Sequence, residues 1–532
     1  MWPPPEATSH RGSRWRSCTY GWTGWWANCS RSAPPAGSRR PSPADDARSR
    51  RPPDARPPYP RSEARHLKGR AMTPRSARPP AGPEDQPHLL LISGIGGHPP
   101  AAALDSLARI GPAVSVVHIA AWGDPEPVRA DWAARALRGE FLTAADLDDA
   151  VTVGLALHER YPLSGVVTYS ELLLRPQAEL AERLGLPGNT PEAVGIAQSK
   201  SRQRQVFAEH GVPSPRFAEI REEADLAEAA RSIGLPAVFK PSLGAGSQSV
   251  RLVRTYGELV EAYRDGRATV SAFLQSEDVF LLEERLALEA DGDSGWAAYC
   301  SVESLLAAGE RHHLAVSDRI RLRHGYAEEG ASMPSRLDAA VQAAVVDCAD
   351  RAIRAIGLTT GAVHTEIALT PDGPRVIEVN ARAGGPMPVM FEVGAGYDYA
   401  EQIGRSALGL APDTAARFTR TALVRMVPIP AGEWRVTAQT PVPELMAAHP
   451  ELAYVRPRFE VGQSASRDRT LHLATFMLGA PTPAAALELA GRIERALGIE
   501  LREAGAPAGP EPLPGPEPLP EPLPESALAR AT

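Results

Sequence analysis

Lysine is almost absent from this chain, which makes the few lysines that remain informative. The 532-residue sequence has 57 lysine and arginine residues, of which only Lys68, Lys200 and Lys240 are lysine. Lysine is a compact point charge on a flexible stem, whereas arginine presents a planar fork of donors. Lys200 and Lys240 fall in the part expected to fold, so we interpret them as candidate contacts to a phosphate group.

Cysteine and long apolar runs are also scarce, which excludes several classes of protein. The four cysteines lie far apart without a Cys-x-x-Cys pair: Cys18, Cys29, Cys300 and Cys348. That spacing supports neither a disulfide framework nor a zinc site. No apolar run approaches the roughly 20 residues that span a bilayer. The head has no apolar segment of the kind that export signals contain, so Arg39-Arg40 is not interpreted as an export signal. A cytoplasmic protein without a membrane partner is therefore expected.

The two ends differ in composition from the rest of the chain. Residues 1–85 are rich in Arg, Pro, Ser and Trp, and residues 504–532 repeat Glu-Pro-Leu-Pro. Such segments bury too little apolar surface to offset their ordering entropy, so both are predicted to be disordered. The Arg/Trp-rich head can be interpreted as an RNA-binding arm. We favour the other interpretation, that it is upstream sequence and that the protein starts at Met72.

Charge separates the head from the remainder. Residues 1–71 carry 14 Lys and Arg against 5 Asp and Glu, which leaves a net charge of −16 on residues 72–532 from the whole-chain value of −7. Nucleic-acid binding needs clustered cations to meet the phosphates. The acidic remainder therefore argues against a nucleic-acid partner.

Three folded regions are expected between the ends. Residues 86–195 open with the apolar run His88–Ser93 and a glycine-rich turn, then alternate strand and helix patterns. This predicts a Rossmann-like α/β domain with a parallel sheet. The turn lacks the dinucleotide fingerprint, because Pro99 occupies a glycine position. Residues 196–411 carry the candidate chemistry, and residues 412–503 predict a small β-rich subdomain.

A predicted hairpin within residues 362–382 places two glutamates opposite each other. Two alternating runs flank Pro371-Asp372-Gly373, and a three-residue loop there pairs Glu366 with Glu378. In that register Ile377 faces the core. Carboxylates about 5 Å apart repel unless a cation lies between them. With Asn380 they form an all-oxygen set suited to Mg²⁺ or Mn²⁺. The alternative is the solvent-facing side of an ordinary hairpin.

A glycine- and serine-rich loop follows Lys240, at the end of the expected strand Ala237–Pro241. Its small residues, among them Gly244, Gly246 and Ser247, allow several backbone N–H groups to turn toward one anion. The loop joins two strands and lacks the GxxxxGK[ST] pattern, so it is not a Walker P-loop. The alternative is an ordinary hairpin loop beside a stray lysine.

In this order the segments resemble the ATP-grasp superfamily. The matching elements are Lys200 with Arg204, residues 211–215, Phe239-Lys240-Pro241 with its loop, residues 281–284, Glu366, and the ExNxRxGG run from Glu378 to Gly385. The resemblance covers about residues 196–411, and ExNxRxGG is its most specific motif. Ser301-Val302-Glu303-Ser304 followed by HHLAVSDR is similar to amino-acid ligases and carnosine-synthase-like enzymes.

The resemblance implies a two-lobed ATP-grasp domain and a role for each matched position. It implies that Lys200 and Lys240 bind ATP phosphates and that Glu283 marks the segment that contacts adenine. Glu366, Glu378 and Asn380 would hold Mg²⁺. Arg382 would stabilise the transferring phosphoryl group or the substrate carboxylate. The segment after Glu283 is longer than expected, so Glu289 is only a candidate for the ribose-binding acid.

The implied reaction joins a carboxylate to an amine with release of ADP and phosphate. The carboxylate attacks the γ-phosphate of ATP to give an acyl phosphate, which the amine then displaces. The expected partners are small molecules, with amino acids as the expected carboxylate and amine, and a homodimer is left open. His312, His313 and His364 are interpreted as structural or surface residues. Two alternatives stay open: a carboxylase or purine-pathway ligase, and a non-catalytic ATP-binding module.

Overall fold

The computed structural model describes residues 86–111, 113–244, 250–268, 278–288, 295–322, 328–467 and 471–504. The N-terminal residues 1–85, the tail after residue 504, and the candidate positions Gly246, Ser247 and Glu289 lie outside the described residues. None of the described helices is long and apolar enough to cross a bilayer.

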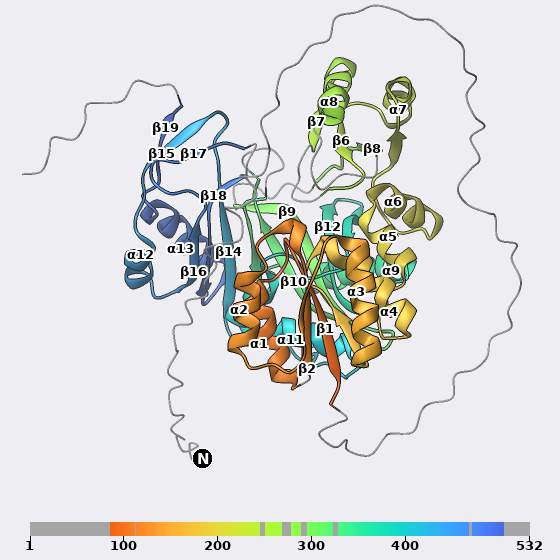
Figure 1. The fold of residues 1–532 in the computed structure, drawn as a ribbon. Helices are drawn as coiled ribbons and strands as arrows, with labels where there is room; N and C mark the ends of the chain where they lie inside the picture. Colours follow the sequence, from red (N-terminus) through yellow and green to blue (C-terminus); the bar gives the residue numbers. More distant parts are fainter. Residues whose placement is uncertain are drawn as a thin grey trace, which may run out of the picture.

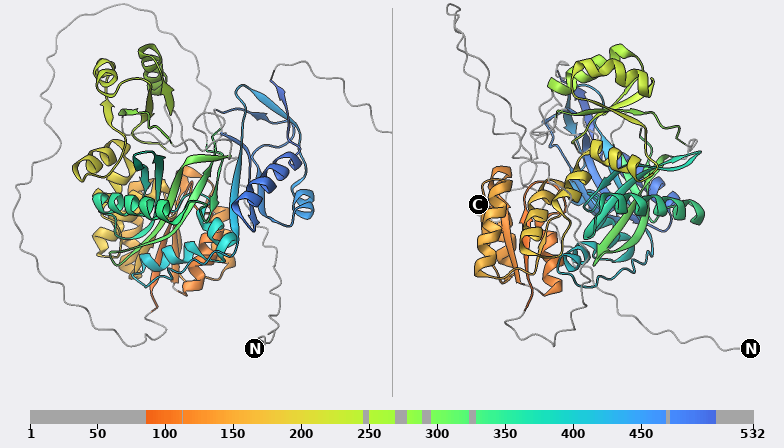
Figure 2. Two further views of the ribbon diagram at one scale, coloured as in Figure 1. Left: turned by 180° about the vertical axis from the view of Figure 1, so that it is seen from behind. Right: turned by 90° about the vertical axis from the view of Figure 1, so that its right-hand side faces the viewer.

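The N-terminal region is a parallel sheet covered on both faces by helices (Figures 1 and 2). Its strand order is β3-β2-β1-β4: β1 (His88–Ser93), β2 (Ala113–Ile119), β3 (Phe141–Ala144) and β4 (Gly165–Val167). Alternate residues of β1 face opposite layers. Leu89 and Leu91 pack with α1 (Pro100–Ile110), and Leu90 and Ile92 pack with α3 (Leu147–Arg160). The predicted Rossmann-like domain is confirmed.

An eight-stranded sheet forms the centre of the molecule. Its strand order is β13-β12-β9-β10-β11-β14-β18-β16: β9 (Trp296–Ala307), β10 (Glu310–Ile320), β11 (Gly330–Met333), β12 (Gly361–Thr370), β13 (Gly373–Asn380), β14 (Thr421–Pro428), β16 (Leu452–Pro457) and β18 (His472–Ala480). Helix α9 (Ala339–Ile356) packs on one face, and the opposite face meets the N-terminal region through α10 (Met387–Ala395) and α11 (Tyr399–Ala407). Three of the strands after residue 412, β14, β16 and β18, thus continue the same sheet.

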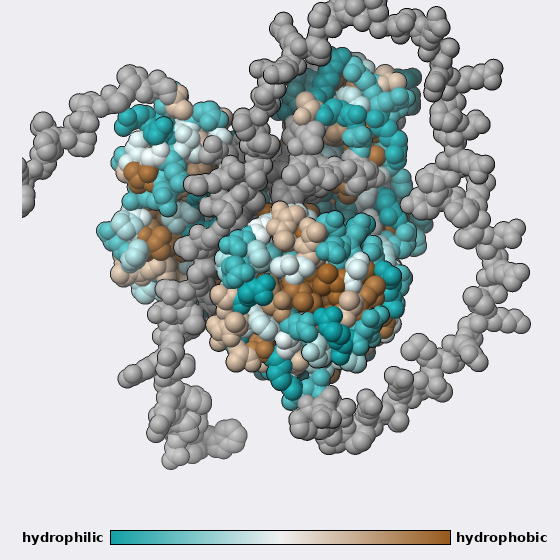
Figure 3. All heavy atoms as spheres, viewed as in Figure 1, coloured by the Kyte–Doolittle hydropathy of each residue, from teal (hydrophilic) through white to brown (hydrophobic). Residues whose placement is uncertain are grey.

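A smaller lobe stands above the central sheet (Figure 1). Its four strands have the order β5-β8-β6-β7: β5 (Phe217–Ile220), β6 (Ala237–Pro241), β7 (Arg251–Val253) and β8 (Phe280–Glu284). They pack against α7 (Leu226–Ile233) and α8 (Tyr256–Ala268), while α6 (Lys200–Glu209) lies between this lobe and the large one. The lobe's surface in Figure 3 is mostly hydrophilic.

Further strands and helices complete the described fold. They include a three-stranded sheet β17-β15-β19, with β15 (Trp434–Ala438), β17 (Ser464–Ala465) and β19 (Glu500–Glu503), and the helices α2 (Glu126–Ala134), α4 (Leu174–Leu184), α5 (Pro191–Gln198), α12 (Val442–Ala448) and α13 (Pro483–Ala496).

The hairpin β12–β13 confirms the opposition of Glu366 and Glu378 and corrects its turn. Thr370 pairs with Gly373, so the loop has two residues rather than the predicted three. A bulge beyond Glu366 then pairs Ile367 with Val376 and leaves Ile377 without a partner in this ladder. The residue buried beside Ile367 is therefore Val376, and the prediction that Ile377 faces the core is wrong.

The glycine-rich turn after β1 gives a test of the N-terminal packing. Gly97 has φ +78°, and a Cβ there would lie 1.9 Å from the backbone oxygen of Tyr169. Gly185 has φ +63° with nothing within 4 Å of that position. A non-glycine residue at positive φ costs about 1–3 kcal/mol in either place, but only Gly97→Ala adds a clash with backbone. We expect Gly97→Ala to lower the Tm clearly more than Gly185→Ala, and equal losses would contradict this close approach.

Candidate functional site

The hairpin carboxylates lie at the meeting point of the two lobes. Glu366 and Glu378 project from neighbouring strands on one face, with side chains 26% and 21% exposed. Lys200, at the start of α6, places its Nζ 2.9 Å from Glu378 Oε1. The same ammonium donates to the carbonyl oxygen of Gly244, also at 2.9 Å. Lys200 therefore joins the hairpin to the beginning of the glycine-rich loop.

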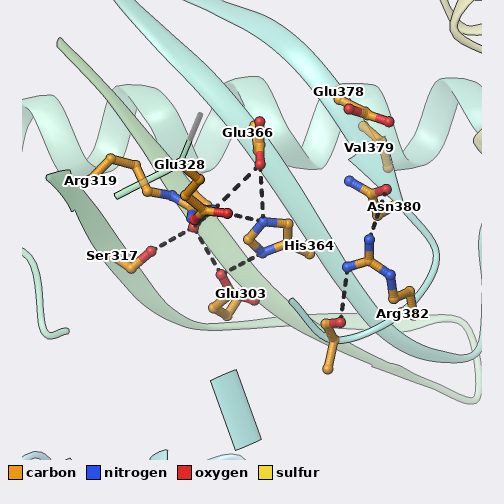
Figure 4. A network of polar contacts seen from close by, with 12 residues as sticks. Glu303, Ser317, Arg319, Glu328, His364, Glu366, Glu378, Val379, Asn380 and Arg382 are labelled. Atoms are coloured by element: carbon orange, nitrogen blue, oxygen red, sulfur yellow. Dashed lines mark hydrogen bonds and ion pairs between the residues drawn. The ribbon is translucent and has the colours of Figure 1, made fainter. Parts of the chain in front are cut away.

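Glu366 lies beside two cations from the large lobe (Figure 4). His364 Nε2 and Arg319 Nη2 are each 3.5 Å from Glu366 Oε1. Burial alone would raise the pKa of Glu366, but the hydrogen bond from His364 and the charge of Arg319 outweigh it and lower the pKa to about 2. The carboxylate of Glu366 is therefore ionised at any physiological pH, and its oxygens can serve as metal ligands.

A second carboxylate holds the histidine behind Glu366. His364 Nδ1 lies 2.7 Å from Oε1 of Glu303, which is fully buried on β9. Burial lowers the pKa of His364, yet Glu303 and Glu366 together raise it to about 9. Arg319 Nη2 is 2.8 Å from His364 Nε2 and opposes protonation there. The two carboxylates outweigh both burial and Arg319, so the net shift of the His364 pKa is upward.

Arg319 itself is buried on β10 and carries several of these contacts (Figure 4). It pairs with Glu328, which precedes β11, and donates to the hydroxyl of Ser301 at 3.2 Å. The sequence placed Arg319 inside the HHLAVSDR run without giving it a role. Its only signal was that resemblance, because the spacing of the run does not reveal that Arg319 reaches Glu366.

Arg382 is held between the hairpin and the N-terminal region. Its Nε lies 2.9 Å from Oε2 of Glu171, in the short 3-10 helix Glu171–Leu173, and its Nη2 donates to Asn380 Oδ1 at 3.4 Å. Burial raises the pKa of Glu171, while the charge of Arg382 opposes the shift. Sequence reasoning missed Glu171, since no motif in its region points to Arg382.

Lys240 is paired inside the small lobe. Its Nζ lies 2.8 Å from Oε2 of Glu283 on β8, and Glu283 Oε1 lies 2.9 Å from Nε of Arg204. All three side chains are at most 7% exposed. Burial would raise the pKa of Glu283, but Arg204 and Lys240 hold it below its usual value.

The structure brings most of the predicted site residues together. Glu366, Glu378 and Asn380 share the hairpin, Lys200 reaches Glu378, and Gly244 contacts Lys200. Lys240 and Glu283 form a separate pair in the small lobe. His313 bonds Ser304 at 2.9 Å and lies 3.4 Å from Asp350, as expected of a structural histidine. The ligand that each predicted residue contacts stays a prediction.

Two protein-family models match this chain. An ATP-grasp domain matches residues 233–389, and an ATP-grasp N-terminal domain matches residues 108–188. The chain carries ATP-grasp domains. The matched segments contain Lys240, Glu283, both hairpin glutamates and the ExNxRxGG run, while Lys200 precedes the first model and follows the second.

Known proteins similar to this chain include two ligases and a synthase. Alanine–anticapsin ligase of Bacillus subtilis is 32% identical over 43% of this chain and 50% of its own length. Carnosine synthase 1 of Homo sapiens is 31% identical over 42% of this chain and 28% of its own length. The match therefore spans half or less of these relatives. The L-amino acid ligase structure from Bacillus licheniformis shares the fold, with TM-score 0.63 and 20% identity over 79% of this chain and 99% of that chain.

Replacing Lys240 by arginine tests whether this buried ammonium contacts a nucleotide. The planar guanidinium is larger than the ammonium of this side chain, which is only 7% exposed, and overpacking typically costs about 1–3 kcal/mol. We expect Lys240→Arg to weaken binding of ADP with Mg²⁺ at least about tenfold, as loss of one charged hydrogen bond would. Calorimetry gives the Kd, and Tm reports the packing cost separately. An affinity equal to that of the wild type would contradict a phosphate contact by Lys240.

Proposed function

We propose that this protein is an ATP-dependent ligase that joins a carboxylate to an amine, with amino acids as substrates, and releases ADP and phosphate. The observation that carries the proposal is the convergence of cations on two facing carboxylates at the junction of the lobes. Lys200 lies 2.9 Å from Glu378, and Arg319 and His364 lie 3.5 Å from Glu366. The similarity to alanine–anticapsin ligase and carnosine synthase supports amino-acid substrates.

The residues of the hairpin fit a magnesium ion. Their donor atoms are carboxylate and amide oxygens, which Mg²⁺ prefers over nitrogen or sulfur. Within the described part of the chain, no group of three or more His, Cys, Asp or Glu side chains is arranged to hold a metal. Glu366, Glu378 and Asn380 would therefore hold the cation together with oxygens from outside the protein. A bound Mg²⁺ would supply positive charge that offsets the negative charge of the ATP phosphates.

The chain's own residues supply the remaining parts of the mechanism. Lys200 and Lys240 bind the phosphates as point charges, and Lys200 moves from Glu378 to do so. The substrate carboxylate oxygen forms a bond to the γ-phosphorus as the bond to ADP breaks. The amine nitrogen then bonds to the acyl carbon and gives up a proton to solvent, and the bond from the acyl carbon to phosphate breaks. Arg382, fixed by Glu171, stabilises the negative oxygen of the tetrahedral intermediate.

Further features belong to the same proposal. We propose that Mn²⁺ supports the reaction in place of Mg²⁺, that the protein works in the cytoplasm, and that it forms a homodimer. The division into regions 86–195, 196–411 and 412–503 is part of it, with strands β14, β18 and β16 of the last region joined to the central sheet. Phosphate contacts by Gly246 and Ser247 and a ribose contact by Glu289 also remain proposals.

A substrate panel tests the proposed function. ATP-dependent release of ADP and phosphate is measured with pairs of amino acids, with bicarbonate, and with a phosphorylated sugar amine, and mass spectrometry identifies the product. We expect turnover with at least one amino-acid pair and a dipeptide product. Turnover only with bicarbonate or the sugar amine would favour a carboxylase or purine-pathway ligase. ADP binding without turnover in any mixture would favour a non-catalytic module.

Neutralising the hairpin glutamates tests the metal site. Glu378→Gln and Glu366→Gln remove a charged oxygen donor with little change in shape, so Mg²⁺-dependent ATP cleavage should be lost while the fold survives. Glu140→Gln is the matched control, because Glu140 is 30% exposed and pairs with Arg160 in the N-terminal region. Circular dichroism verifies folding. Wild-type ATP cleavage by Glu378→Gln would rule out its role as a ligand.

A further inference from the structure

Arg204 is a large, fully buried side chain whose contacts reach both lobes. It lies on α6 with 0% of its side chain exposed. Its Nη2 donates to the carbonyl oxygen of Ile377 at 2.6 Å, and its Nε lies 2.9 Å from Glu283. The second contact is an ion pair without hydrogen-bond alignment, since neither atom has a hydrogen-bond partner. Nothing in the mechanism above uses Arg204.

The hydrogen bond from Arg204 to Ile377 lies along the exposed edge of β13. Strand β13 is the last strand of the central sheet, so its outward backbone groups need partners from elsewhere. Gln203 bonds both the N–H and the C=O of Val379, each at 2.9 Å, and Arg204 takes the carbonyl of the bulged residue Ile377. The beginning of α6 thereby supplies hydrogen-bond partners to the outward backbone groups of the strand that carries Glu378 and Asn380.

The ion pair between Arg204 and Glu283 determines the net charge around Lys240. Glu283 is one carboxylate between two buried cations, Arg204 and Lys240, so the cluster carries an excess of one positive charge. Without Arg204, Lys240 and Glu283 would form a closed, neutral pair. An ammonium engaged in such a pair attracts a phosphate less strongly, because its charge is already compensated in a poorly screened site.

We propose that Arg204 is a positioning residue for nucleotide binding, which shares the charge of Glu283 so that Lys240 remains available to an anionic phosphate. Its bond to Ile377 holds this cluster in fixed relation to the hairpin that carries Glu378. Arg204 acts through Lys240 and does not itself contact the nucleotide. The inference rests on the proposed function only in one respect, namely that the ligand is a nucleotide.

A double-mutant cycle with Lys240 tests this coupling. Calorimetry measures the Kd for ADP with Mg²⁺ in the wild type, Arg204→Met, Lys240→Met and the double variant. We expect each single change to weaken ADP about tenfold, and the double variant to match Lys240→Met within about twofold. A double variant weakened about a hundredfold would show independent effects and overturn the proposal. Unchanged affinity in Arg204→Met would overturn it too, whereas a wild type that binds no nucleotide would overturn the proposed function itself.

Two further variants separate charge from packing. Arg204→Lys keeps the positive charge and should bind ADP within about threefold of the wild type. Arg204→Gln keeps a donor for Ile377 but loses the charge, and should bind about tenfold more weakly. Equal losses in these two variants would mean that Arg204 acts only by filling space. They also carry the test if Arg204→Met fails to fold. Arg135→Met, which removes the partner of Asp105 in the N-terminal region, is the control and should leave the Kd unchanged.

Discussion

Two glutamates that face each other across a β-ladder repel, and much of the chemistry of this molecule is arranged around that repulsion. Glu366 and Glu378 stand in register on β12 and β13. Lys200, Arg319 and His364 approach them from three different elements of the fold. Together these groups offset part of the repulsion between the two carboxylates, and a bound metal ion would offset it further.

The cations near the hairpin are themselves held by further carboxylates. Glu303 fixes His364, Glu171 fixes Arg382, and Glu328 fixes Arg319. Charges removed from water carry a large desolvation penalty, which an alternating arrangement of opposite charges offsets only with good geometry. Such a network specifies one orientation for each side chain. It therefore suits a site that must position phosphates and a carboxylate accurately.

The parts of the fold that depend on local sequence could be predicted, and the parts that depend on distant contacts could not. The strands His88–Ser93 and Ala237–Pro241 have the predicted bounds, because each contains a short apolar run and is followed by turn residues. The opposition of the two hairpin glutamates followed from turn chemistry and alternation. The bulge at Ile377 did not, since Arg204 and the edge of the sheet stabilise it and neither is visible in the hairpin's own residues.

The candidate site likewise has parts that could be predicted from the sequence and parts that could not. The scarcity of lysine pointed to Lys200 and Lys240, and each is buried beside a glutamate. Glu171 lies in another region of the chain from Arg382, and only the packed structure brings the two together. The predicted subdomain after residue 412 was recognised by its strands, but no local pattern showed that β14 would hydrogen-bond to β11.

The continuity of the central sheet limits how this protein can change during evolution. Strands β14, β18 and β16 add to β11 edge to edge, so residues 412–503 are not an interchangeable module. Exchange of this segment by recombination would have to preserve the ladder between Gly330–Met333 and β14, or leave an open edge that invites aggregation. New substrates are therefore more accessible through single substitutions and loop changes than through the shuffling of whole segments.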